Sequence, residues 1–194
     1  MSRIAYRLTT CLLAAIVLAG CSTLVQRQTC MALASEVDFC LAPLTPTTAI
    51  DSQTLQVHIQ LGEQSHQLLT QLEVSEAQAT MVGLAPLGNA LFTVTYDGQQ
   101  IISEQSPLLG DNFKAEYLLA MLQLIYWPID DVNQHLQQGR LVSERETAVM
   151  GRRLYANNNP VAAIDIQYNS QQINQAQVRL TIPDANFTMT VTPL

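Results

Sequence analysis

The stretch Thr54-Leu-Gln-Val-His-Ile-Gln-Leu61 decides the fold, because apolar and polar side chains alternate along it with a period of two. Successive side chains of a β-strand point to opposite faces, so this period predicts a strand with one buried face. That face would carry Leu55, Val57, Ile59 and Leu61. The polar turn Gly62-Glu63-Gln64 follows and would send the chain back.

The same period recurs on both sides of one interruption. Before it, we predict strands at residues 65–74, 79–85, 90–96 and 100–104, with Asp97-Gly98 as a strong hairpin signal. After it, we predict strands at residues 140–146, 150–156, 161–168, 177–182 and 187–191. About ten strands joined by short turns predict a mainly β (α+β) domain over residues 51–194, built on an antiparallel sheet.

The interruption is a predicted helical pair within residues 113–138. Residues 113–127 follow a predicted cap at Asp111-Asn112 and are apolar almost all round, until Pro128 ends the helix. Residues 129–138 form a second, more polar helix that ends at Gly139. A helix that is apolar on every side must be covered on more than one side, or it faces something apolar that is not protein.

The N-terminus looks like a lipoprotein signal peptide. Arg3 and Arg7 precede an apolar run over residues 8–19, and Leu18-Ala19-Gly20-Cys21 is similar to a lipobox. The run is too short to span a bilayer. We therefore expect residues 1–20 to be removed and Cys21 to carry acyl chains; an ordinary signal peptide with a chance cysteine is the alternative. Ser22 stands where inner-membrane retention signals place Asp, which indicates an outer-membrane, periplasm-facing protein.

The composition argues against nucleic-acid binding. The chain has nine Lys and Arg, of which Arg3 and Arg7 would leave with the signal peptide, against sixteen Asp and Glu, so the mature charge would be about −9. Such a surface repels phosphate backbones. Charged residues make up only 13% of the chain and hydrophobic residues 48%, which fits an apolar interior larger than usual.

Two cysteines remain for the folded protein, Cys30 and Cys40. In an oxidising compartment an even pair predicts a disulfide, which would stabilise the fold by about 3 kcal/mol through closure of a short loop. Free thiols and a metal site are the alternatives. Both cysteines lie in residues 21–50, a Thr/Pro/Ala-rich segment. We predict that this segment is a tether, which joins the folded domain only towards its C-terminal end.

Residues that could carry catalysis or bind a metal are few. The chain contains no nucleophile elbow, zinc-protease motif, phosphate loop or dinucleotide fingerprint, so we expect a protein that is not an enzyme and uses no cofactor. His58 and His66 could approach across the first hairpin and bind a metal with Glu63, but a solvated surface is the simpler interpretation. Arg152-Arg153 could pair with lipid headgroups or with Glu144 and Glu146; we favour the latter.

Several further stretches resemble one bacterial family. They are Gly83-Leu84-Ala85-Pro86-Leu87-Gly88, Leu91-Phe92-Thr93, Tyr96-Asp97-Gly98, Ser106-Pro107-Leu108-Leu109, Leu118-Leu119-Ala120, Gln123-Leu124, Trp127-Pro128 and Gly151-Arg152-Arg153-Leu154. Together they resemble an uncharacterised lipoprotein family, a domain of unknown function whose genes often lie beside those for aryl polyene and related lipids. The resemblance implies an architecture similar to the Lol lipoprotein carriers, in which a strongly curved antiparallel sheet or half-barrel wraps around helices and leaves a cavity for acyl chains.

This resemblance and the apolar patterning together predict a carrier that binds an acyl or polyene lipid. A periplasmic carrier protein would be a further partner. The candidate lining residues come from the predicted strands and the first helix: Leu55, Val57, Leu72, Phe92, Val94, Met121, Leu122, Ile125, Trp127, Ile164 and Ile166. Periodicity cannot separate a pocket from a filled core, so ordinary core packing is the alternative for each residue. The alternative for the whole protein is a structural or accessory lipoprotein of an envelope assembly.

Overall fold

The computed structural model describes residues 26–27, 29–44, 52–110, 113–146 and 149–194 of the chain. The predicted signal peptide, Cys21 and the predicted helix cap at Asp111-Asn112 lie outside the described residues. Within them, no helix is long and apolar enough to cross a membrane.

The described chain forms one large antiparallel sheet and one small one. The large sheet has eleven strands in the order β1-β8-β7-β6-β5-β4-β14-β13-β12-β11-β10. Its strands are β1 (Gln26–Arg27), β4 (Ser52–Leu61), β5 (Gln64–Val74), β6 (Ala79–Leu84), β7 (Ala90–Tyr96), β8 (Ile101–Gln105), β10 (Gly139–Glu146), β11 (Val149–Ala156), β12 (Ala162–Tyr168), β13 (Val178–Ile182) and β14 (Phe187–Pro193). Each of the ten predicted strands is present, with ends that lie within two residues of the predicted ones.

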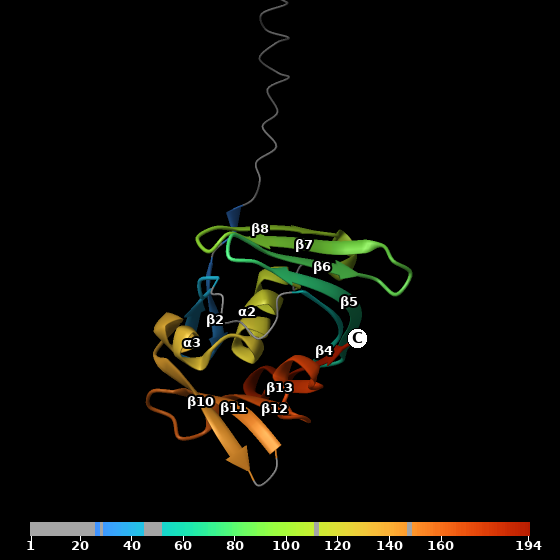
Figure 1. Cartoon of the computed structure of the whole chain (residues 1–194). Coiled ribbons are helices and arrows are strands. Elements are labelled where there is room, and N and C mark those ends of the chain that lie inside the picture. The colour runs from blue at the N-terminus through green and yellow to red at the C-terminus, as the bar shows by residue number, and fades with distance from the viewer. Residues whose placement is uncertain (1–25, 28, 45–51, 111–112, 147–148) are drawn as a thin grey trace, which may run out of the picture.

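The large sheet curves around helix α2 (Ala115–Tyr126) without closing into a barrel (Figure 1). Its first and last strands in the order, β1 and β10, do not pair with each other among the described residues. The mainly β half-barrel with an inserted helical pair is therefore confirmed.

Alternation along the strands explains the single core. In β4 the side chains of Leu55, Val57 and Ile59 are buried, and the intervening Gln56 and His58 are exposed. All residues of α2 except Tyr117 are buried, which confirms that this helix is covered on more than one side. The second helix, α3 (Ile129–His135), ends earlier than predicted, because the next two residues form strand β9 (Leu136–Gln137).

The N-terminal segment differs from the tether that its composition predicts. Strands β2 (Cys30–Ala34) and β3 (Val37–Cys40) form a hairpin, and β3 also pairs with β9 in the small sheet. The hairpin and the residues after it bury six apolar side chains in the core, namely Met31, Leu33, Val37, Phe39, Leu41 and Ala42. The segment is therefore part of the folded domain over residues 29–44.

The hairpin also explains the disulfide between Cys30 and Cys40. The two residues are direct partners in the register of β2 and β3, with their Cα atoms 3.8 Å apart, and their sulfur atoms are bonded. The predicted bridge is present. It closes the hairpin at the ends of the two strands, so it fixes the part of the chain that packs against α2 (Figure 1).

Candidate lipid-binding pocket

A pocket of about 400 Å³ lies between the N-terminal half of α2 and one end of the sheet. The β4–β5 turn, the short helix η3 (Pro183–Ala185) before β14, and the short helix η1 (Pro107–Leu109) contribute to that end. Fifteen of the described residues line the pocket, and most are apolar: Ala32, Leu33, Ile59, Leu61, Gln64, His66, Leu109, Phe113, Lys114, Tyr117, Leu118, Met121, Ile182, Ala185 and Phe187. Apolar lining with a few polar groups is typical of small-molecule sites.

One wall of the pocket is an aromatic cluster. The ring of Phe113 lies 5.6 Å from that of Phe92 and 6.2 Å from that of His66, centroid to centroid. Phe92 in turn covers Gly83 on the neighbouring strand, where an added Cβ would lie 2.1 Å from the Phe92 ring. Only glycine therefore leaves room for Phe92, and Phe92 supports Phe113 at the pocket.

The polar groups of the lining are Gln64, His66, Lys114 and the hydroxyl of Tyr117. Lys114 is exposed and immediately precedes α2; its ammonium lies 5.8 Å from the centre of the Tyr117 ring. His66 is half-buried on β5. The lining thus contains an apolar floor with a cation and hydrogen-bonding groups beside it.

The C-terminal half of α2 lies in a filled core instead. Gln123 is fully buried and makes two hydrogen bonds with the backbone of Ala42: its Oε1 accepts from the amide at 2.7 Å, and its Nε2 donates to the carbonyl at 3.0 Å. The indole of Trp127 donates to the carbonyl of Pro43 at 3.2 Å. These bonds hold the chain after the hairpin against the helix.

A buried arginine of β11 binds the backbone carbonyls at the C-terminal end of α2. The Nη1 atom of Arg152 donates to the carbonyls of Leu124 and Trp127, at 2.8 Å each. Carbonyls at a helix C-terminus lack intrahelical donors and carry partial negative charge, so a cation there is stabilising. Burial lowers the pKa of Arg152. Arg152 therefore supports the core through the helix carbonyls, Glu144 pairs with Arg153 instead, and the side chain of Glu146 lies outside the described residues.

Two buried tyrosines add to the same core. Tyr168 donates to the carbonyl of Ile125 at 2.8 Å, and Tyr96 donates to that of Leu41 at 3.0 Å. Burial raises the pKa of Tyr168 to about 12. Burial, together with the charge of Asp97, also raises the pKa of Tyr96 to about 12.

The predicted lining residues divide between the pocket and the core. Met121 lines the pocket. The other ten are at most 2% exposed, belong to the core and are absent from the lining: Leu55, Val57, Leu72, Phe92, Val94, Leu122, Ile125, Trp127, Ile164 and Ile166. Seven of them lie on the inward face of the sheet, and Leu122, Ile125 and Trp127 lie on or directly after α2, so their periodicity is that of a packed core.

Most of the residues that line this pocket were not among the predicted lining residues, and many of them lie at strand ends and in connections. Leu109, Ala185 and Phe187 lie in or beside short 3-10 helices, and Ala32 and Leu33 lie in the unpredicted hairpin. The sequence carried a signal for some of the lining residues, since Ile59 and Leu61 end the apolar face of the first predicted strand, and Phe113 and Leu118 belong to the predicted apolar helix.

The two histidines do not form a metal site. His66 is the register partner of Ile59 and shares its inward face, whereas His58 lies on the outward face and its Nε2 is 2.8 Å from the hydroxyl oxygen of Ser65. Among the described residues, no three His, Cys, Asp or Glu side chains are grouped closely enough to hold a metal ion.

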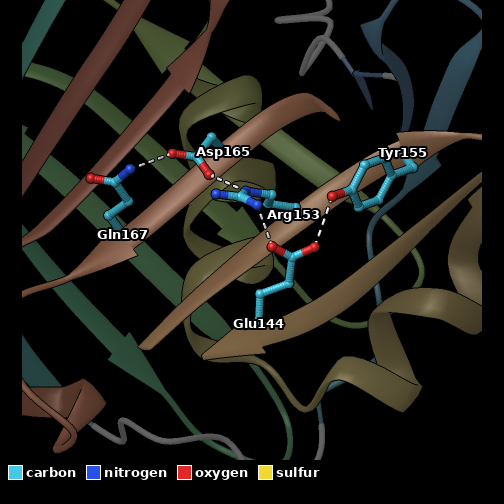
Figure 2. A network of polar contacts seen from close by, with 5 residues as sticks. All are labelled: Glu144, Arg153, Tyr155, Asp165 and Gln167. Carbon is cyan, nitrogen blue, oxygen red and sulfur yellow. Dashed lines mark hydrogen bonds and ion pairs between the residues drawn. The ribbon is translucent and has the colours of Figure 1, made fainter. Parts of the chain in front are cut away.

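The charged residues of β10 to β12 form a network on the outer side of the sheet (Figure 2). Arg153 contacts Glu144 through its Nη1 and Asp165 through its Nε, the latter at 2.9 Å. Tyr155 donates to Glu144, and Gln167 donates to Asp165, each at 2.8 Å. The predicted pairing of Arg153 with Glu144 is confirmed, and we interpret this network as structural.

Comparison with known proteins agrees with the family resemblance. Residues 52–194 match the model of a family described as "Protein of unknown function (DUF3261)". The match covers the large sheet from β4 to β14 and both helices. No curated protein matches the chain. Since the matched region is well over half of the sequence, the chain belongs to the DUF3261 family.

Proposed function

We propose that this protein is an outer-membrane lipoprotein that binds or transfers a lipid with its apolar pocket, without catalysing a reaction on it. The observation that supports the proposal most directly is the pocket of about 400 Å³, whose lining is mainly aliphatic and aromatic. Each methylene that leaves water for such a site contributes about 0.8 kcal/mol. An acyl or polyene chain would therefore bind without directional contacts.

The fold offers a physical reason for an unfilled pocket. A curved sheet wraps the whole of α2, but the inward face near the β4–β5 turn extends beyond the hairpin that covers the rest of the helix. Of the apolar side chains there, Leu61 is 39% exposed and Phe113 and Phe187 are only partly buried, which leaves apolar surface for a ligand. A ligand chain supplies the missing contacts, which is the arrangement typical of binding proteins for apolar ligands.

The proposed membrane anchor would keep the pocket near a bilayer. Cys21 precedes Gln26 of β1 by five residues, so its acyl chains would lie within about 17 Å of the sheet. Leu87 and Leu108 are 92% and 81% exposed, in the β6–β7 turn and in η1. Both connections lie at the pocket end of the sheet, so we propose that this end faces the membrane.

The lipid-binding proposal is tested with two matched leucine variants. Leu61 is 39% exposed and lines the pocket, whereas Leu69 is 37% exposed on β5 and lies outside the lining. We expect the purified mature protein to bind a fluorescent apolar probe saturably, Leu61→Glu to weaken that binding at least about tenfold, and Leu69→Glu to leave it unchanged.

Two results would overturn this proposal. One is the absence of saturable probe binding by folded wild-type protein, which would favour a structural or accessory lipoprotein with no ligand. The other is an equal loss of binding in both leucine variants. Circular dichroism of all three proteins establishes that they are folded.

The anchor is tested separately. Cys21→Ser removes the acyl acceptor, so labelled palmitate should enter the wild-type protein and not the variant, and the wild type should fractionate with the outer membrane. Equal labelling of both proteins would refute lipidation at Cys21, and recovery with the inner membrane would refute the sorting expected from Ser22.

A further inference from the structure

The charges around the pocket are opposite to those of the chain as a whole. The chain carries sixteen acidic residues and a single lysine, Lys114. That lysine is among the fifteen lining residues, and none of the fifteen is acidic. Of the described acidic residues nearby, Glu63 and Asp184 in the adjoining turns are exposed, Glu116 on α2 is buried, and none of the three is in the lining. Among the described residues, a lining that holds a cation and no carboxylate in an acidic chain favours an anionic ligand group.

Lys114 is positioned to bind the anionic group of a ligand whose remaining part contacts the apolar lining. Tyr117, Leu118 and Met121 share one face of α2, and the ammonium of Lys114, the residue just before the helix, lies 5.8 Å from the centre of the Tyr117 ring on that face. The axial distance from Lys114 to Met121 is about 10 Å. A chain lying along this face would have one end beside the ammonium and the other against the buried methionine.

Strand β5 adds two hydrogen-bonding side chains to the lining. Gln64 and His66 of β5 line the pocket, and the His66 ring packs against Phe113, the residue before Lys114. An amide and an imidazole can both donate hydrogen bonds to an oxyanion. The cation and these donors thus line the same pocket, and His66 is linked to the residue before the cation through its ring contact with Phe113.

From this arrangement we infer that the ligand is a single-chain amphiphile with an anionic head group, whose head is bound by Lys114 and whose tail lies along α2 towards Met121. The inference rests on the proposed lipid-binding function and specifies its ligand class. A carboxylate and a phosphate ester share the required chemistry. Lys114 therefore acts as a specificity-determining residue, and the apolar lining supplies the remaining affinity.

The test compares three ligands with the same tail: dodecanoate, dodecyl phosphate and dodecanol. Each competes with the fluorescent apolar probe on wild-type mature protein and on Lys114→Gln. We expect at least one of the anions to bind the wild type about fivefold more tightly than dodecanol, and Lys114→Gln to weaken that anion more than dodecanol, so that the preference is lost. Lys114→Arg should restore it. The two anions tell a carboxylate from a phosphate ligand.

Arg179→Gln is the matched control, because Arg179 is exposed on β13, lies outside the lining, and its loss changes the total charge equally. This variant should keep the wild-type preference. Equal binding of all three ligands by the wild type, or an equal effect of the two charge variants, would overturn the head-group inference and leave lipid binding standing. Failure of dodecanol and of the probe to bind would overturn the proposed function itself.

Discussion

The two halves of helix α2 have similar apolar composition and different surroundings. The N-terminal half presents Tyr117 and Leu118 to a pocket, which extends to Met121 just past the middle of the helix. The C-terminal half is enclosed by the sheet and held by polar groups that bond its backbone or side chains, among them Gln123, Tyr168 and Arg152. Apolar sequence alone thus produces a filled core or an open pocket, and the difference lies in what covers the helix.

The covering elements explain this difference. The segment after the hairpin reaches Gln123 and Trp127 through the backbone of Ala42 and Pro43. Nearer the start of the helix, the hairpin contributes only Ala32 and Leu33 to the pocket wall. The open half is therefore the half that neither the hairpin nor the sheet fills completely.

The largest expected effect is the difference between glutamate substitutions at two neighbouring residues of α2. Leu122 is completely buried in the core, whereas Met121 lines the pocket. Leu122→Glu would bury a carboxylate without a partner at a cost of several kcal/mol, comparable to the whole stability of a domain, so we expect unfolding. In Met121→Glu the carboxylate can reach water in the pocket. That variant should stay folded and lose probe binding. Thermal melting and probe titration of both variants measure this difference in stability and binding. Unfolding of both variants, or probe binding by both, would contradict the assignment of Leu122 to the core and Met121 to the pocket.

The second effect concerns the hairpin that covers the helix. Replacing Cys30 and Cys40 together by serine removes the bridge and should reduce the free energy of unfolding by about 3 kcal/mol. Because Leu33 of the same hairpin lines the pocket, probe binding should also weaken. Denaturant unfolding of the double variant, compared with wild type with and without reductant, gives the value. An unchanged midpoint would mean that the hairpin is held by its packing alone.

A smaller effect is expected at the hydrogen bonds between Gln123 and Ala42. Gln123→Leu keeps the side chain's approximate volume and leaves a buried amide and a buried carbonyl without partners, which should cost about 2 kcal/mol. The matched control is Gln67→Leu, at an exposed position on β5, which should be nearly neutral. Probe binding by folded Gln123→Leu should match wild type, since Gln123 is absent from the pocket lining. Equal stability of the two variants would contradict the assigned bonds.

The smallest effect is confined to alkaline solution. Tyr96 and Tyr168 have pKa values raised from 10 to about 12 in the folded protein, so folding favours their protonated forms. Their contribution to stability is complete below pH 10 and is lost as the pH rises through about 12. Each anion would also lose the bond that it donates to a carbonyl. Denaturant midpoints should fall over this range and fall less in Tyr168→Phe; a parallel fall in the variant would exclude Tyr168 as a cause.

The sequence pattern by itself determined the strands and the helical pair, and the family resemblance implied the half-barrel. Strict alternation, as in Leu55, Val57 and Ile59, follows from the strand geometry and requires no knowledge of partners. The cysteine pair and the N-terminal lipobox pattern were equally local signals, one confirmed by the disulfide and the other still a prediction.

Tertiary structure alone decided where the core is filled and where the pocket opens. Leu122 and Met121 are neighbours in a helix that is apolar almost all round, so the sequence pattern does not distinguish them. In the structure Leu122 is enclosed and Met121 lines the pocket. The hairpin from Cys30 to Cys40 looked like a tether, because its burial depends on α2 and β9, which come about a hundred residues later. Burial is a property of what surrounds a side chain, and a one-dimensional pattern records only which side chains can be buried.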